Sequence, residues 1–98
     1  NIIDDITPPV ASISNPLSGQ TVGGAVSFTV QAVDDFGVTN VQFFIDGESV
    51  ATDYTEPYQI EWDTTNLENE SQHTLSAYVT DQAGHTTIAQ PILVIISN

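Results

Sequence analysis

The segment Val26-Ser27-Phe28-Thr29-Val30-Gln31-Ala32 carries an apolar side chain at every second position and a polar one between. Successive side chains of a β-strand point to opposite faces, so this alternation predicts a strand with one face in a hydrophobic core. The same period of two recurs along the chain, in the segments 10–14, 41–45, 58–62, 75–79 and 92–96, with a short strand at Val50. No segment shows a convincing helical period. Val, Ile and Thr supply 32 of the 98 residues, which favours an all-β protein.

Turn-forming residues separate these segments. Asp46-Gly47 is a strong signal for a two-residue hairpin turn, and Asp81 to Gly84 predicts another turn. About seven short strands, with a turn roughly every 8–12 residues and no helical connection, predict an immunoglobulin-like sandwich of two antiparallel sheets. A length of 98 residues fits one domain. We expect residues 8–98 to form this domain and residues 1–7 to be a linker from a preceding domain.

The charge of the chain is unusual, because it has 13 acidic residues and no lysine or arginine, for a formal charge of −13. Binding to nucleic acid and to anionic lipid depends on cationic side chains, so the sequence argues against both partners. It also has no apolar run of about 20 residues that could insert into a membrane, and it has no cysteine. Two interpretations of the acids stay open: they are hydrated in a saline medium, or some of them bind Ca²⁺.

A set of short motifs covers nearly the whole chain, in the order Pro8 to Pro16, Gly19 to Val22, Val33 to Val38, Val41 to Gly47, Pro57 to Thr65, His73 to Leu75 and Asp81 to Gly84. In these motifs the chain resembles the bacterial Ig-like domains that are repeated in secreted hydrolases and surface adhesins. The resemblance implies an immunoglobulin-like fold and an extracellular or cell-surface location. It also implies a spacer, adhesion or accessory module in tandem arrays, whose partners include neighbouring domains of the same chain. It does not fix a ligand.

An immunoglobulin-like path collects several acids in the loops at the end where the chain enters the sandwich. Carboxylates that converge there repel one another, and Ca²⁺ relieves such repulsion because it takes about 6–8 oxygen ligands in flexible geometry. The candidate ligands, completed by backbone carbonyls and water, are Asp5, Asp34, Asp35 and Asp81. The alternative is that these aspartates only form turns, since an Asp side chain accepts hydrogen bonds from nearby backbone N–H groups. No cofactor other than Ca²⁺ is implied.

A second candidate site lies on the outer face of one predicted sheet. If Phe43 points into the core, the next residue points outward, and the same argument places three more apolar side chains on this face. The predicted surface patch consists of Phe44, Tyr78, Leu93 and Ile95. Three uses stay open for it: packing against a domain or partner, stacking on sugar rings, or an ordinary surface. Trp62 shares the inward stripe of segment 58–62 and is therefore predicted to belong to the core.

These observations favour a protein that is not an enzyme. No serine lies in a nucleophile-elbow motif, and the two histidines lack the spacing of a zinc site. The leading hypothesis is a structural spacer or adhesion repeat of a larger extracellular bacterial protein, with Ca²⁺ stiffening the domain junctions as an open addition. Besides the neighbouring domains of the same chain, such a repeat would have a cell-surface glycan or protein as a partner. The rival hypothesis is an accessory carbohydrate-binding module of a secreted enzyme that degrades polysaccharide.

Overall fold

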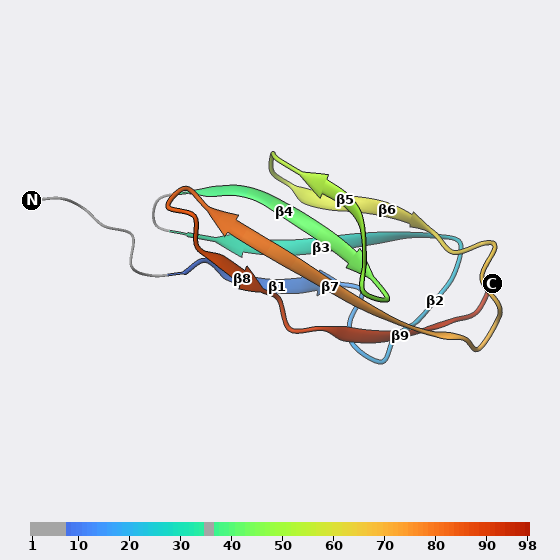
Figure 1. Cartoon of the computed structure of the whole chain (residues 1–98). Coiled ribbons are helices and arrows are strands. Elements are labelled where there is room, and N and C mark those ends of the chain that lie inside the picture. The colour runs from blue at the N-terminus through green and yellow to red at the C-terminus, as the bar shows by residue number, and fades with distance from the viewer. Residues whose placement is uncertain (1–7, 35–36) are drawn as a thin grey trace, which may run out of the picture.

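The computed structural model describes residues 8–34 and 37–98, which form nine strands (Figure 1). The strands are β1 (Val10–Asn15), β2 (Thr21–Val22), β3 (Ala25–Val33), β4 (Val38–Ile45), β5 (Glu48–Asp53), β6 (Tyr58–Asp63), β7 (Gln72–Asp81), β8 (Thr86–Ile88) and β9 (Ile92–Ile96). Among the described residues there is no helix with the length and apolarity needed to cross a membrane. The predicted all-β class is confirmed, whereas the predicted linker, residues 1–7, lies outside the described residues.

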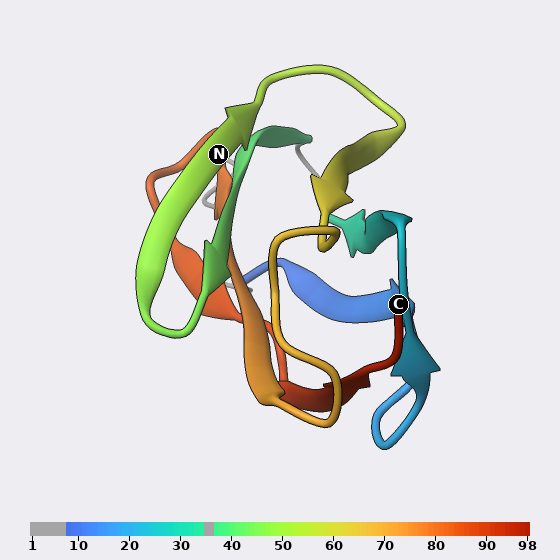
Figure 2. The ribbon, with the colours of Figure 1, turned by 90° about the vertical axis from the view of Figure 1, so that its right-hand side faces the viewer.

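The strands form two packed sheets, which Figure 2 shows end on. The smaller sheet has the order β1-β3-β6, and the larger sheet has the order β2-β9-β7-β4-β5, with β8 attached to β7. The pairs are antiparallel except for β2 with β9, which is parallel. This arrangement is the predicted immunoglobulin-like sandwich.

The core lies between the sheets, where the predicted alternation is confirmed in β3 and β4. Every second residue of β3 from Val26 to Ala32 is buried, and so is Phe43 of β4. Phe28 of the smaller sheet and Phe43 of the larger sheet meet edge to face, with ring centroids 5.0 Å apart and ring planes at 83°. Aromatic pairs favour this geometry, and here it joins the two sheets.

The structure differs from the sequence prediction in both sheets. Strands β2 and β8 were not predicted, because they have only two and three residues and are too short for an alternation to be recognised. Trp62, predicted for the core, is only partly buried and packs against it. In β5, Ser49 pairs with Phe44 while Ala51 pairs with Phe43, so Val50 is bulged out of the ladder and 49% exposed.

The sandwich has two distinct ends. At the entry end, β1 begins where β3 and β7 end (Figure 1), because Val10 pairs with Val33. At the exit end, the C-terminus lies beside the β2–β3 turn and the β6–β7 loop, because Asn98 forms hydrogen bonds with Gly24 and Asn69. The chain therefore runs from one end of the sandwich to the other.

Candidate functional site

Two of the four predicted calcium ligands lie at the entry end. Asp34 follows β3 and Asp81 ends β7. Their loops are joined by a hydrogen bond that Gln82 N donates to the carbonyl oxygen of Gly37, at 3.1 Å. Asp5 and Asp35 lie outside the described residues. Within the ranges 8–34 and 37–98, no three His, Cys, Asp or Glu side chains gather as ligands of a metal ion would.

Asp81 is buried and holds its own turn together. Its Oδ1 accepts hydrogen bonds from Ala83 N at 3.0 Å and from His85 N at 2.7 Å. Its Oδ2 lies 3.1 Å from His85 Nδ1. Both carboxylate oxygens are thus engaged within the turn, which is the turn-forming role that the sequence left open for this residue.

The predicted surface patch is split in two by the structure. The rings of Phe44 and Tyr78 lie on neighbouring strands of the larger sheet, with centroids 4.5 Å apart and planes at 34°. Tyr78 pairs with Ile88 of β8, which is 55% exposed. Leu93 and Ile95 instead pair with Thr74 and Gln72, farther along β7 towards the exit end.

The sequence prediction placed all four residues in one patch because it did not include strand β8. Ile88 takes the place beside Tyr78 that the prediction assigned to the last strand. The only sequence signal for it would have been an isolated apolar residue after Thr86 and Thr87. The aromatic pair of Phe44 and Tyr78, with Ile88, is the contiguous part of the candidate surface.

The surface around the aromatic pair is free of acidic residues on β4 and β7. β4 contains no Asp or Glu, and the only one in β7 is Asp81, whose side chain is buried. Gln42 pairs with Tyr78, and Ser76 pairs with Phe44, so amide and hydroxyl groups surround the two rings. In a chain with 13 acids, this face offers a neutral surface with aromatic rings.

A chain of hydrogen bonds near the exit end was not predicted from the sequence. Asp46 Oδ2 lies 2.6 Å from His73 Nδ1, and His73 Nε2 lies 3.0 Å from Ser71 Oγ. Ser71 Oγ is also 2.6 Å from the carbonyl oxygen of Glu68, which can only accept, so the serine hydroxyl donates to that oxygen. A nucleophilic serine donates to its histidine instead. The arrangement is therefore suited to holding loops in place.

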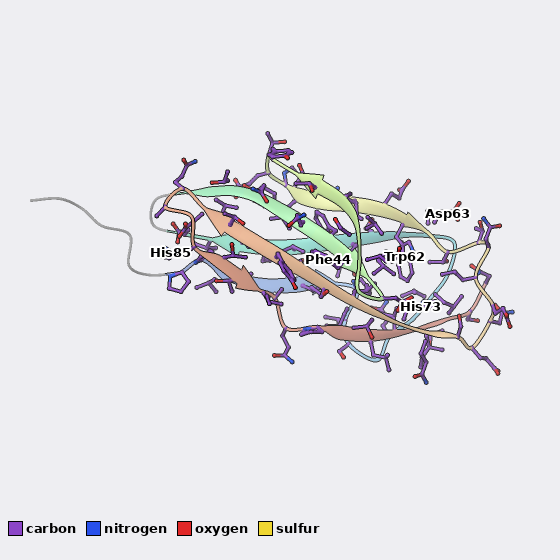
Figure 3. All side chains as sticks on the ribbon, in the orientation of Figure 1. Phe44, Trp62, Asp63, His73 and His85 are labelled. Carbon is purple, nitrogen blue, oxygen red and sulfur yellow. The ribbon has the colours of Figure 1, made fainter. Side chains whose placement is uncertain are left out.

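Asp46 fastens the β4–β5 turn to β7. It has a φ of 54°, and Gly47 has a φ of 85°, as the predicted Asp-Gly turn requires. Its Oδ1 accepts a hydrogen bond from Thr74 N at 2.9 Å. Partial burial works to raise the pKa of the Asp46 carboxyl, but the bonds from His73 and Thr74 outweigh it and lower the pKa. Trp62 packs edge-on against His73, with centroids 5.9 Å apart (Figure 3).

The exit end is closed by the side chain of Asn98. Its Oδ1 accepts a hydrogen bond from Gly24 N at 2.8 Å, and its Nδ2 donates to the carbonyl oxygen of Thr64 at 2.6 Å. Its backbone N–H donates to Asn69 Oδ1 at 2.7 Å. The residue at the end of the chain is therefore tied to the β2–β3 turn and to the β6–β7 loop, which fixes its position on the domain.

Solved structures of other proteins contain the same sandwich. The fibronectin(III)-like modules of Clostridium thermocellum CbhA are 26% identical to this chain, over 93% of it and 46% of their own chain, with a TM-score of 0.69. An endo-beta-1,4-mannanase from Thermotoga petrophila is 17% identical, over 97% of this chain and 21% of its own, with a TM-score of 0.74. Dimeric latent PorU from Porphyromonas gingivalis is 21% identical to this chain. The match covers 97% of this chain and 10% of the PorU chain, with a TM-score of 0.64.

The last two likenesses show the fold alone, and this chain spans less than half the length of each of the three proteins. A comparison with curated proteins finds no match. The family model of the bacterial Ig domain matches residues 9–77, which is most of the sandwich. The resemblance noted in the sequence is thereby confirmed, and the chain belongs to the bacterial Ig domain family.

Proposed function

We propose that this chain is a non-catalytic, extracellular spacer or adhesion repeat of a larger bacterial protein. The observation that carries the proposal is the path of the chain, which enters at one end of the sandwich and leaves at the other (Figure 1). Domains joined in this way follow one another end to end, so each copy adds its length to the distance between its flanking domains. A tandem protein of two copies should therefore be elongated in solution.

The anchored exit end supports the same proposal. A spacer holds its neighbours at a distance only if the chain does not fold back at the junction. The hydrogen bonds of Asn98 to Gly24, Thr64 and Asn69 hold the last residue against two loops. The next domain would then continue from a fixed point of the sandwich.

The comparisons support an extracellular setting and a role without catalysis. The CbhA modules and the mannanase contain this sandwich as 46% and 21% of a longer chain, which fits a domain that serves a larger protein. In the Ser71–His73–Asp46 chain the serine hydroxyl donates its hydrogen bond to the backbone carbonyl of Glu68, which supports a structural role for these residues.

We include in this proposal a Ca²⁺ ion that binds at the entry end, with the Asp34 carboxylate as one of its ligands. Asp34 is partly exposed at this end, whereas the Asp81 side chain is buried, so Asp34 is the more accessible of the two described candidates. Ca²⁺ that binds only the folded state stabilises it by RT ln(1 + [Ca²⁺]/Kd), or about 1.4 kcal/mol at ten times Kd. In the tandem protein of two copies, we expect the melting temperature to rise by several degrees in millimolar Ca²⁺, as calorimetry would measure.

The control for this experiment is Mg²⁺ at the same concentration and ionic strength, which should produce a smaller shift because it dehydrates reluctantly. Asp34→Asn should reduce the response to Ca²⁺, while Glu61→Gln in the middle of β6, away from both ends of the sandwich, should leave it unchanged. An equal response to both ions, or a melting temperature that stays flat in Ca²⁺, would refute the calcium site and leave the spacer proposal standing.

A second candidate function, the binding of a glycan, is favoured by the aromatic pair. The rings of Phe44 and Tyr78 lie 4.5 Å apart on a face without acids on β4 and β7, and aromatic rings beside amide and hydroxyl groups suit sugar rings. On a panel of insoluble glycans that includes β-1,4-mannan, Tyr78→Ala should abolish retention, and Leu93→Ala should not. If the unmutated chain is retained on no glycan of the panel, this candidate is wrong.

A further inference from the structure

A cleft of about 330 Å³ opens between strands β5 and β6. Each strand is the last one of its own sheet, so no ladder joins the two sheets at this edge. The floor of the cleft is apolar and is formed by Ile45, Ile60 and Trp62, which pack against the core, while the exposed Val50 lines its edge. Its volume is within the range of small ligand sites, which begins at about 300 Å³.

Four carboxylates surround the apolar floor of this cleft: those of Asp46, Glu48, Glu61 and Asp63. Two of them have partners in the fold, since Asp46 bonds to His73 and Asp63 bonds to Thr65. The other two are exposed at the rim: Glu48 at the start of β5, and Glu61 on β6 between Ile60 and Trp62. Their side chains make no hydrogen bond or ion pair with the residues that the structure describes.

We propose that this cleft binds a lysine or arginine side chain from a basic segment of a protein partner. The long aliphatic stem of such a side chain would pack on Ile60 and Trp62, and the charged head would lie at the rim, where Glu48 and Glu61 are exposed. A cation beside the indole ring gains a further attraction from the ring quadrupole. The chain has no lysine or arginine of its own, so none of its side chains can supply that cation.

The chemistry of the cleft selects this occupant over the alternatives. A Ca²⁺ ion would gain nothing from the apolar floor, because its ligands are oxygen atoms. A neutral apolar group would desolvate the rim carboxylates without giving them a partner. A strand that pairs along β5 would meet the bulge at Val50, which interrupts the regular edge. Insertion of a cationic side chain satisfies both the apolar floor and the acidic rim.

Trp62 is the only tryptophan of the chain and lines the cleft, so its fluorescence reports on this site. The probe is an acetylated and amidated hexapeptide of alternating valine and arginine, titrated at fixed ionic strength. We expect a saturable change of the Trp62 emission. The double substitution Glu48→Gln and Glu61→Gln should weaken binding about fivefold to tenfold, because both charge partners of the arginine are lost.

The matched control is the double substitution Glu68→Gln and Glu70→Gln, which removes the same charge from the β6–β7 loop and should change binding less than about twofold. A peptide with citrulline, a neutral analogue of arginine, should bind more weakly by about the same fivefold to tenfold. Equal weakening by the two double variants would overturn the proposal in favour of general attraction to an acidic surface. A stronger response to a glucosamine tetramer than to the arginine peptide would overturn the assignment to a protein partner. Unchanged melting temperatures would show that all the variants fold.

Discussion

Replacing Phe43 by alanine should lower the free energy of unfolding by about 3–5 kcal/mol, the range for removing a large aromatic side chain from a core. The Phe43 side chain is fully buried and meets Phe28 of the other sheet at 5.0 Å between ring centroids. The substitution removes this contact and leaves a cavity that the surrounding strands fill only in part. A small domain has a total stability of about 5–15 kcal/mol, so the variant should approach the limit of folding.

Denaturant unfolding, followed through the fluorescence of Trp62, would measure this change. Phe44→Ala is the matched control, because it removes the same atoms at the adjacent position, on the outer face of the sheet. It should lower the free energy of unfolding by about 1 kcal/mol, mostly through the lost contact with Tyr78. Equal losses for the two variants would contradict the assignment of Phe43 to the core and Phe44 to the surface.

Gly23→Ala should have the second large effect, a loss of about 2–3 kcal/mol. A Cβ at this position would overlap the carbonyl oxygen of Ser97, which belongs to the backbone and cannot rotate away. The parallel pair of β2 and β9 would have to separate, together with the bond from Ser97 N to the carbonyl oxygen of Val22. The exit end would loosen at the place where the chain leaves the domain.

Denaturant unfolding would measure the loss, and amide hydrogen exchange would locate it at Ser97 and Gly24. The control is Gly19→Ala, because Gly19 has a φ of 86° but no atom would lie within 4 Å of the added Cβ. That variant should lose only about 1 kcal/mol from the left-handed conformation, with unchanged exchange at the exit end. A Gly23→Ala variant with normal stability and normal exchange would show that the close approach of the two backbones is not needed.

The fold could be predicted because its decisive signals are local. Neighbouring residues alone determine the alternation from Val26 to Ala32 and the Asp46-Gly47 turn. The structure confirms both. Strand β8 escaped prediction because three residues carry no period, and it pairs with β7 only in the folded chain. That omission is why Ile88 was not placed beside Tyr78.

The candidate sites depend on contacts that no local pattern encodes. His73 and Asp46 are 27 residues apart, and Gly24 and Asn98 are 74 residues apart, so only the folded chain brings them together. The cleft likewise needs Glu48 and Glu61 on the edges of two different sheets. The outward position of Phe44 could be predicted from the sequence, because alternation along the strand alone directs its side chain away from the core.

The most direct test of the spacer proposal is small-angle X-ray scattering of the tandem protein of two copies of residues 1–98, compared with the single chain. Because the chain enters and leaves at opposite ends, the tandem protein should have a maximum dimension close to twice that of the single domain. If Ca²⁺ stiffens the junction, the dimension should increase further when the ion is added. A tandem protein hardly longer than one domain would mean that the copies pack side by side, and it would contradict the spacer proposal.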